Sequence, residues 1–502
     1  MTVQAGAPCK GQACWTEPGL QAARHTDLPA PARSVNATVR GALYAGKEFL
    51  IPARKRSSVK ILLISFHFPP DAPIAATRAP KFAKYLIEAG HDVRVLCARD
   101  PQAHIAHALE IDEDRVVRTD WRDLRAIPGE VLNRIVPARA DASGASADPA
   151  SVAPAPPPRS RLRARLSETY DSAVCRPDRQ VGWRPYAVKA ARVLFESWTP
   201  DLVYATCPPH SVAPITVEIA KLAKAPFIVE FRDRWALDAY SDRPEWRQRL
   251  DRRQEAGVLA DAAGIVTVSP VWAETYAARY GADRIAVAMN GFDPADYPLE
   301  MDVQPAVGRD RIELLFAGAL YPGRRDPRAI FQAIALLGED AKRVGVTMLG
   351  KDLGPALAMA GEAGVEDCLT LLPPEPHAAI VKRQYAADAL LMLQWNDERD
   401  AGTVPGKVFE CIGARRPVIA TGWTTGVVGK MVMRRNLGVI ANEPRILANK
   451  ISALLSEKRA HGTIAPLPAS VRDGLTRHEQ FSSLDPFLAR AAGVSAARIA
   501  AE

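Results

Sequence analysis

Short runs of consecutive apolar residues recur along the chain and alternate with stretches in which apolar residues return every three or four positions. The first run, VKILLISF at 59–66, is typical of a strand buried on both faces of a sheet. Residues 79–91 show helical spacing and stop at Gly90, a residue that suits a helix C-terminus. DVRVLCA at 92–98 is the next apolar run. This order of strand, helix and strand predicts a parallel sheet.

The same alternation continues in two series. The first runs from AVKAARVLFESW to IAVAMNG and the second from IELLFAGAL to PVIAT. Between them, residues 292–311 contain three prolines and many charges, which favours an interdomain linker. After about residue 460 the pattern is mostly helical. The chain is therefore predicted to be an α/β protein with two Rossmann-like, doubly wound domains that face each other across a cleft, followed by a C-terminal helical segment.

Composition sets the remaining boundaries. Residues 1–57 mix Pro, Gly, Ala, Arg and Lys without periodicity, as a disordered extension or a misassigned start would. Residues 138–165 are rich in Ala, Pro, Ser and Arg, which is typical of a flexible insertion. The expected domains are 58–291, which holds this insertion, and 312–460, with a helical tail at 461–502.

In open α/β sheets, ligands bind beyond the carboxyl ends of the strands, and the stretch GTVPGKVFECIGARRPVIA (402–420) follows a predicted strand. A helix is expected to start near Gly406, where free backbone amides would attract a diphosphate. Lys407 adds a positive charge. Glu410, one turn later, offers a carboxylate that accepts two hydroxyl hydrogen bonds, as a ribose requires. The alternative is a glycine-rich loop with a solvated lysine and glutamate.

A second candidate anion site is GALYPGRRDP (318–327), between a predicted strand and a predicted helix. Gly318, Arg324 and Arg325 would face the same phosphates from a neighbouring loop. Arginine side chains suit bidentate phosphate contacts. The alternative is a surface turn with exposed arginines.

Two further strand ends carry polar residues. His210, in ATCPPHS (205–211), would act on a hydroxyl or phosphate, although a single histidine is more often packed or capping. Glu230, Arg232 and Asp233 follow the next strand, where they would form either part of a site or an internal ion-pair cluster.

Composition and charge narrow the class of protein. Of the 502 residues, 48% are apolar and 24% are charged, as in a globular protein with a sizeable core. The net charge of +8 fits anionic partners such as sugar nucleotides or phospholipid surfaces. A nucleic-acid partner would rest on net charge alone and is not expected. The basic stretch RSRLRAR (159–165) indicates a solvated linker or, less often, a membrane or nucleic-acid contact.

Cysteine usage and hydropathy address the compartment. The seven cysteines form no CxxC pair and no zinc-binding spacing with histidine, which favours a reducing compartment and no bound metal. No run of about 18 apolar residues predicts a membrane span, and no secretory signal is evident.

Three other functional motifs can be considered, and the sequence does not support any of them. The DED at 112–114 matches a metal-binding DxD, but it lies in an acidic run away from the strands. GVVGKM (426–431) resembles a phosphate-binding loop but lacks its first glycine and its final Ser or Thr. No GxGxxG follows the first strand, which argues against a dinucleotide enzyme.

The chain from about Lys60 to about Leu455 resembles GT-B glycosyltransferases of the GT4-like group, similar to bacterial polysaccharide and cell-wall sugar transferases. The resemblance rests on ILLISFHFPPDAPIAATRAPKFAKYLIEAGHDVRVL, PDLVYATCPPHSVAPITVEIAKLAKAPFIVEFRDRW and GTVPGKVFECIGARRPVIA, and on their order and spacing. It implies an amino-terminal half that holds the acceptor and a carboxyl-terminal half that holds a nucleotide-diphosphate sugar.

The resemblance also implies roles for matching positions. Arg324 or Arg325 corresponds to the basic residue that neutralises the diphosphate, supplemented by Lys407. Glu410 corresponds to the second glutamate of the family's E-x7-E motif, which holds the donor ribose. The full set implied is catalytic His210, Arg324, Arg325 and Lys407; donor-binding Gly318, Leu372, Pro373, Gly402, Thr403, Val404 and Glu410; and acceptor-side Arg78, Glu230 and Asp233. Leu372 and Pro373 would lie at the nucleobase.

Two positions depart from the family pattern. The first glutamate of the motif would fall at Gly402, so that backbone amides from Gly402 to Val404 would have to replace its contacts with the donor sugar. The glycine-rich loop expected after the first strand is replaced by Ala75, Ala76 and Thr77, followed by Arg78.

The function expected is transfer of a sugar from a nucleotide-diphosphate sugar to a hydroxyl acceptor, with retention implied by the family, and without a metal or any cofactor besides the donor. Polysaccharide, cell-wall or glycolipid synthesis, a lipid-linked acceptor and a cytoplasmic location at the inner membrane face are the expected setting. The alternatives are a non-catalytic nucleotide-sugar or polysaccharide-binding protein and a nucleotide-sugar epimerase.

Overall fold

The computed structural model describes residues 58–70, 77–100, 108–126, 174–238, 240, 243–321 and 323–493. The predictions for residues 1–57, for the insertion at 138–165 and for the basic stretch at 159–165 lie outside these described residues.

The first half is a parallel sheet with strand order β3-β2-β1-β4-β5-β6-β7. The chain crosses from β2 and β3 on one side of β1 to β4 on the other, so the sheet is doubly wound as predicted. Its strands are β1 (Lys60–Ile64), β2 (Asp92–Ala98), β3 (Val116–Thr119), β4 (Leu202–Cys207), β5 (Phe227–Phe231), β6 (Gly264–Thr267) and β7 (Ile285–Val287). Its helices are α2 (Arg78–Glu88), α5 (Arg184–Phe195), α6 (Val212–Ala223), α7 (Glu245–Asp261) and α8 (Pro270–Tyr280).

The second half is a parallel sheet with order β10-β9-β8-β11-β12-β13. Its strands are β8 (Ile312–Ala317), β9 (Val344–Leu349), β10 (Leu369–Leu372), β11 (Ala389–Leu393), β12 (Val418–Thr421) and β13 (Gly438–Ile440). Its helices are α9 (Arg328–Ala335), α10 (Gly354–Glu362), α11 (His377–Ala386), α12 (Gly406–Ala414), α13 (Val427–Arg434) and α14 (Pro444–His461).

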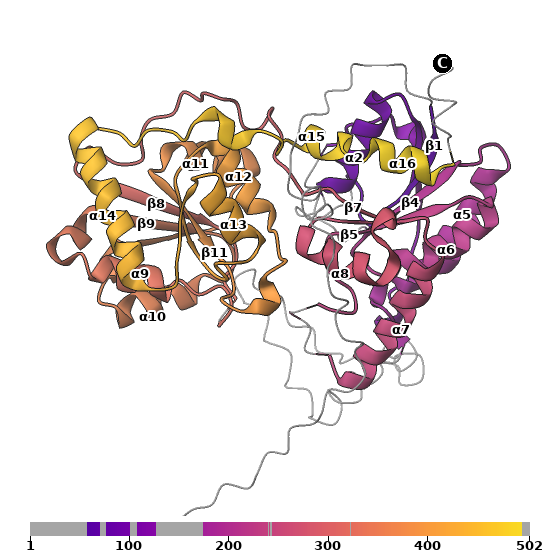
Figure 1. Ribbon diagram of the computed structural model, residues 1–502, viewed down its shortest axis with the longest axis horizontal. Coiled ribbons are helices and arrows are strands. Elements are labelled where there is room, and N and C mark those ends of the chain that lie inside the picture. The colour runs from indigo at the N-terminus through magenta and orange to yellow at the C-terminus, as the bar shows by residue number, and fades with distance from the viewer. Residues whose placement is uncertain are drawn as a thin grey trace, which may run out of the picture. The chain divides into compact units, whose positions relative to one another are not determined.

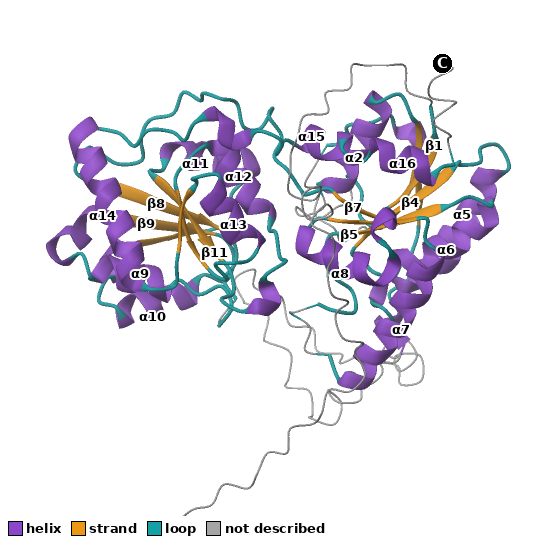
Figure 2. Ribbon diagram, viewed as in Figure 1, coloured by secondary structure: helices purple, strands orange, loops and turns teal. Residues whose placement is uncertain are grey.

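Helices cover both faces of each sheet (Figure 1 and Figure 2). In the second half, α9, α10 and α14 contribute to the core on one face, and α11, α12 and α13 contribute to the core on the other. The central strands of each sheet are buried on both faces, which is why they appear in the sequence as continuous apolar runs, whereas the edge strands β3 and β7 are half-buried. In helices, apolar residues are buried on one side only. The helix α2 shows this, because helical spacing places Ala79, Phe82, Ala83 and Leu86 on its buried side.

The C-terminal segment crosses back to the first half. The helices α15 (Arg477–Ser482) and α16 (Asp485–Ala491) lie beside α2 (Figure 1). Phe481 and Leu484 belong to the same buried cluster as Phe82 of α2 and Tyr204 of β4. The helices expected after residue 460 are present, but they complete a core rather than form a free tail.

The connection at 292–311 contains no helix or strand, in keeping with a linker, yet its first part is packed. Phe292 forms an isolated bridge with Thr476, and Tyr297 is 2% exposed within a core cluster of the second half. These contacts fix the connection to the second half near α11 and α12.

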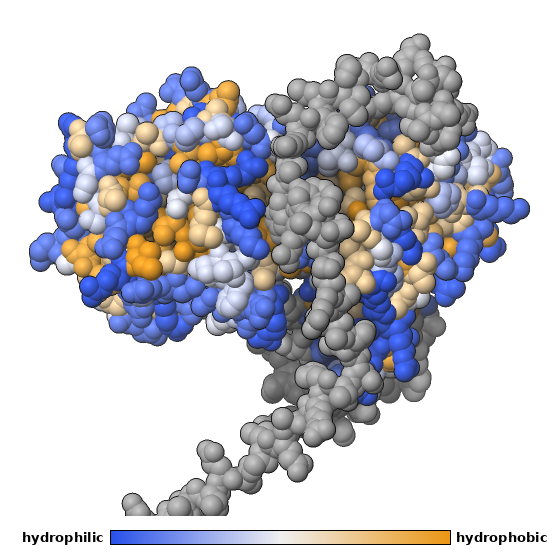
Figure 3. Space-filling model, in the orientation of Figure 1, coloured by the Kyte–Doolittle hydropathy of each residue, from blue (hydrophilic) through white to orange (hydrophobic). Residues whose placement is uncertain are grey.

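Polar and apolar residues are interspersed over the face seen in Figure 3. None of the helices in the described part of the chain is both long and apolar enough to cross a membrane.

Candidate functional site

The helix α12 begins at Gly406, as predicted, directly after the loop that follows β11. Its second residue, Lys407, donates a hydrogen bond from Nζ to the carbonyl of Ala317, the last residue of the neighbouring strand β8. Burial lowers the pKa of Lys407 below its usual range, and the nearby Glu410 carboxylate opposes this shift. The lysine therefore presents its amino group at the carboxyl ends of the two central strands.

Gly318 makes this placement possible. A Cβ atom at Gly318 would lie 2.9 Å from Nζ of Lys407 and 3.0 Å from its Cε. Any larger residue would displace the lysine. The structure thus brings together Gly318 and Lys407, from the two stretches that the sequence indicated as anion sites.

The two predicted arginines have different surroundings. The Arg324 guanidinium lies over the rings of Tyr240 and Trp395, at 5.0 and 4.9 Å from their centroids. Arg325 lies over the Tyr321 ring at 4.8 Å. Burial is the main cause of the lowered pKa of Lys407, and the charge of Arg325 adds to it. Arg325 is therefore within electrostatic reach of Lys407.

Glu410 lies one turn after Lys407 and is held by a buried glutamine. Nε2 of Gln384, on α11, donates to Oε2 of Glu410 at 3.1 Å. Gln384 accepts in turn from the Tyr297 hydroxyl at 2.9 Å. Sequence reasoning missed Gln384 and Tyr297, because neither residue lies in a loop at a strand end.

The loop before α12 is tightly packed. A Cβ at Gly402 would lie 2.2 Å from Nε1 of Trp272, so glycine at the position of the expected first glutamate has a steric reason. The Thr403 amide donates to the Asp400 carbonyl at 2.9 Å, and the Val404 side chain is buried in the core. The Thr403 amide is therefore already occupied, and a donor-sugar contact by these residues stays a prediction.

Leu372 and Pro373 lie at the end of the edge strand β10. Leu372 is half-buried and accepts a hydrogen bond from the Gly350 amide, while Pro373 is exposed. In the described part of the chain, neither residue forms a hydrogen bond or an ion pair with Lys407 or Glu410, and their nucleobase role stays a prediction.

In the first half, Arg78 and Glu230 bind each other. Nη2 and Nε of Arg78 donate to Oε1 of Glu230 at 2.7 and 2.9 Å, and Thr206 donates to Oε2 at 2.6 Å. Arg78 also donates to the carbonyls of Ala288 and Met289. Burial would raise the pKa of Glu230, but the Arg78 charge and these hydrogen bonds hold it below its usual range.

Both side chains of this pair are buried, at 4% and 2% exposure for Arg78 and Glu230. The internal ion pair that the sequence left open as an alternative is present, and the partner of Glu230 is Arg78 rather than Arg232. Asp233 is exposed at the same end of β5. Of the three predicted acceptor-side residues, Asp233 is therefore the one whose side chain is accessible, whereas Arg78 and Glu230 are buried against each other; the acceptor role itself stays a prediction.

His210 stacks on Trp235 with 5.9 Å between ring centroids, and its buried Nδ1 has no hydrogen-bond partner. Burial lowers its pKa to about 3, so the ring is neutral near pH 7. His67, which follows β1 in SFHFPP, has the same features: a buried Nδ1 without a partner and a pKa lowered by burial to about 4. Since β1 and β4 are neighbours, both imidazoles lie at the same edge of the sheet.

Arg232 lies close to both histidines, because its charge contributes to lowering the pKa of each. Its Nη2 donates to the Pro208 carbonyl at 2.7 Å, which fixes the guanidinium. The sequence reading considered Arg232 but missed His67. Its position directly after the first strand was the signal that would have found it.

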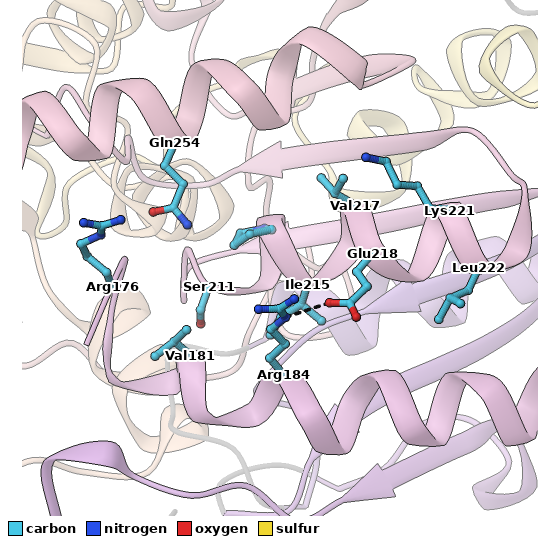
Figure 4. Close-up of a pocket in the computed structure, with 11 residues that line it drawn as sticks. Arg176, Val181, Arg184, Ser211, Ile215, Val217, Glu218, Lys221, Leu222 and Gln254 are labelled. Carbon is cyan, nitrogen blue, oxygen red and sulfur yellow. Dashed lines mark hydrogen bonds and ion pairs between the residues drawn. The ribbon is translucent and has the colours of Figure 1, made fainter. Parts of the chain in front are cut away.

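A cavity of about 640 Å3 lies elsewhere in the first half, along α6 (Figure 4). Apolar residues and charged residues line it, and Arg184 and Glu218 form an ion pair of 2.8 Å at its edge. None of the predicted site residues lines this cavity. A second, very small cavity of about 10 Å3 lies between Lys407, Glu410 and Gln384, with room for about one water molecule.

Within the described residues, no group of three or more His, Cys, Asp or Glu side chains is arranged to hold a metal ion. The candidate site in the second half offers cations and amides instead, which suit an anionic ligand.

Comparison with solved structures identifies the fold. The chain is 14% identical to sucrose-phosphate synthase from Thermosynechococcus elongatus, over 88% of this chain and 98% of that chain, with a TM-score of 0.51. It is also 14% identical to Anabaena Alr3699/HepE in complex with UDP-glucose, over 87% of this chain and 100% of that chain, with a TM-score of 0.51. The chain thus has the two-domain α/β architecture called GT-B, as predicted.

A sequence model of one family matches part of the chain. Residues 75–291 match the glycosyl transferase 4-like domain. This match agrees with the predicted resemblance over that part of the chain, and the solved structures show the GT-B fold. No curated protein matches the chain in sequence.

Proposed function

We propose that the chain transfers a glycosyl group from a nucleotide-diphosphate sugar to a hydroxyl acceptor, with retention of configuration. The observation that carries the proposal is the placement of Lys407. Its amino group is held at the carboxyl ends of β8 and β11, against Gly318 and beside the amino terminus of α12, with no carboxylate bonded to it in the described residues. An anion at this point would be met by an ammonium and by free helix amides.

Charge development on the leaving diphosphate is the step that this arrangement would stabilise. As the glycosyl bond breaks, negative charge grows on the diphosphate oxygens. Lys407, Arg325 and the amides of α12 would meet that charge without a metal. No cofactor besides the donor is needed in this proposal. Glu410 would accept hydrogen bonds from the ribose hydroxyls of the donor.

On the acceptor side, the neutral imidazoles of His210 and His67 offer ring nitrogens to a hydroxyl group, with Asp233 at the same edge. HepE was solved with UDP-glucose, which supports testing UDP-glucose first as a donor. We place the reaction in polysaccharide, cell-wall or glycolipid synthesis at the inner face of the membrane, with a lipid-linked acceptor, on the resemblance to that group.

The direct test measures nucleotide diphosphate released from UDP-, GDP- and ADP-sugars, with and without a panel of hydroxyl acceptors. Lys407→Ala should lower kcat/KM by about 100-fold or more. Lys342→Ala, an exposed lysine on the same half, is the matched control and should have no effect. Release with no donor, together with no nucleotide binding by calorimetry, would overturn the proposal.

The same experiment separates the alternative functions. Binding of a nucleotide sugar without turnover would identify a non-catalytic binding protein, for which the glycine at 402 is the main support. Conversion of the sugar without any acceptor would identify an epimerase.

A further inference from the structure

Three side chains from separate segments form a hydrogen-bonded chain that ends at Glu410. The Tyr297 hydroxyl donates to Oε1 of Gln384 at 2.9 Å, and Nε2 of Gln384 donates to Oε2 of Glu410 at 3.1 Å. Tyr297 lies in the connection between the halves, Gln384 on α11 and Glu410 on α12.

Two of the three hydrogen-bonded side chains are almost inaccessible to solvent. Gln384 is 4% exposed and Tyr297 is 2% exposed. A buried amide must bond at both of its ends, because an unsatisfied polar atom in the interior is costly. Packing alone would favour an apolar residue at this buried position, because glutamine side chains are mostly exposed in folded proteins.

The two bonds fix the direction of the amide. A tyrosine hydroxyl that donates to Oε1 leaves Nε2 as the atom that faces Glu410, where it meets a carboxylate that only accepts. The reverse orientation would place two acceptor oxygens against each other. The Glu410 carboxylate therefore determines which end of Gln384 faces it, and the Tyr297 hydroxyl holds the opposite end of the amide.

Packing holds Tyr297 in turn. A Cβ at Gly413 would lie 2.7 Å from Cγ of Tyr297, so glycine on α12 lets the ring approach the helix closely. The ring also stacks on Tyr385 at 6.4 Å between centroids and meets Phe292 edge-on at 6.3 Å. The start of the hydrogen-bonded chain is thus rigid.

At the other end, only one oxygen of Glu410 is used. Oε2 bonds to Gln384, whereas Oε1 has no hydrogen-bond partner among the residues that the structure describes. Glu410 is also partly exposed, so this oxygen is available to a ligand. With Oε2 held, the carboxylate has a fixed direction before any ligand binds.

We propose that Gln384, held at its other end by Tyr297, is a positioning residue that holds Glu410 for the recognition of a ribose diol. The inference rests on the proposed function, because it assumes that a nucleotide binds beside Lys407. It states that selectivity for a ribonucleotide over its 2′-deoxy counterpart depends on Gln384, a residue that does not touch the ligand.

The experiment measures, by calorimetry, the ratio of dissociation constants of 2′-deoxynucleotide and ribonucleotide, with UDP, GDP and their 2′-deoxy forms as probes. For the wild-type chain we expect a ratio of about 10 or more, because a site built to bond a hydroxyl rejects a ligand that lacks it. Gln384→Ala should reduce the ratio to about 1–3, and Gln384→Glu, which sets a second carboxylate against Glu410, should do the same.

Two further variants test the contribution of the Tyr297 hydroxyl and provide a control. Tyr297→Phe keeps the ring and removes only the hydroxyl, so that the ratio should fall to a value between those of wild type and Gln384→Ala. Gln332→Ala changes an exposed glutamine on α9 of the same half and should leave the ratio unchanged. Thermal unfolding of each variant is recorded alongside.

A ratio keeps the result independent of stability. If Gln384→Ala lowers the unfolding temperature but retains the wild-type ratio, Gln384 is merely structural and the inference is overturned. If wild type binds both nucleotides equally, Glu410 does not read the ribose and the inference is also overturned. If wild type binds no nucleotide at all, the proposed function itself fails, which is a different outcome.

Discussion

The carboxyl edges of the two sheets use their charges differently. In the first half, the predicted residues Arg78 and Glu230 are buried and bound to each other at 2.7 Å. In the second half, Lys407 is bound to a backbone carbonyl, and no carboxylate is bonded to it in the described residues. The Arg78–Glu230 pair at one edge is neutralised internally, whereas Lys407 at the other edge has no bonded carboxylate among the described residues.

This difference separates a structural charge from a functional one. A buried ion pair is stable only while each charge keeps its partner. If one partner turned to a ligand, the other charge would be left buried and unpaired, at a large cost in free energy. A partly buried lysine whose pKa is lowered by desolvation gains when an anion arrives, because the anion restores the charge stabilisation that water no longer provides. Two similar sheets thus carry basic residues with opposite tasks.

The largest expected effect concerns the buried Arg78–Glu230 pair at the carboxyl edge of the first sheet. Arg78→Ala leaves the Glu230 carboxylate buried without its partner, so we expect the free energy of unfolding to fall by about 3–5 kcal/mol. Urea denaturation measures it. Arg249→Ala removes an arginine from an exposed pair with Glu245 and should cost no more than about 1 kcal/mol. Equal losses in the two variants would contradict a structural role for Arg78.

The next effect distinguishes the two arginines of the second edge. Arg325→Ala should lower kcat/KM by about 100-fold, because Arg325 shares the electrostatic field of Lys407. Arg324→Ala should mainly reduce stability, by about 0.5–2 kcal/mol, because its guanidinium is stacked on Tyr240 and Trp395. Steady-state kinetics and thermal unfolding on both variants measure the split. The opposite assignment of losses would show that Arg324 meets the diphosphate.

A third prediction concerns the glycine at the position of the missing glutamate. Gly402→Glu restores the family residue but places its Cβ 2.2 Å from Trp272, so we expect a loss of about 1–3 kcal/mol from overpacking. Gly361→Glu on α10, where an added Cβ meets no atom within 4 Å, is the control. A Gly402→Glu variant as stable as wild type would show that Trp272 yields easily.

The smallest expected effect is the uptake of a fraction of a proton when a diphosphate binds beside Lys407. The pKa of Lys407 lies below its usual range in the free protein, and a bound diphosphate should raise it. Binding at alkaline pH, between the two pKa values, should therefore take up a fraction of one proton, and affinity should fall as the pH rises through this window. Calorimetry in buffers of different ionisation enthalpy measures the uptake. Lys407→Arg, which stays charged, should abolish it.

Much of the fold could be predicted because its signals are local. Continuous apolar runs marked the strands, and the start of α12 at Gly406 followed from a loop, a proline and a helical pattern within a few residues. The neighbourhood of Gly318 and Lys407 also followed, because both stretches lie after strands of one parallel sheet. These signals need no knowledge of distant partners.

Other features depend on residues far apart in the chain. Arg78 and Glu230 are separated by 152 positions, and nothing near either residue reveals the other. The same holds for Gln384, which reads as an ordinary helix residue until α11 packs against α12. The return of α15 to α2 was also not predicted, since a helical pattern does not specify the surface that its apolar side covers.

By itself, the sequence determined the parallel α/β class, the two series of strands and the loops that carry Lys407 and Glu410, because burial periodicity and glycine-rich turns are properties of neighbouring residues. Only the tertiary structure decided which charges are free. Packing paired Arg78 with Glu230, placed Trp272 against Gly402 and set Lys407 beside Gly318 with no carboxylate bonded to it among the residues that the structure describes. The physical reason is that the state of a charged group depends on its desolvation and on its partners in space, and both are set when distant segments meet.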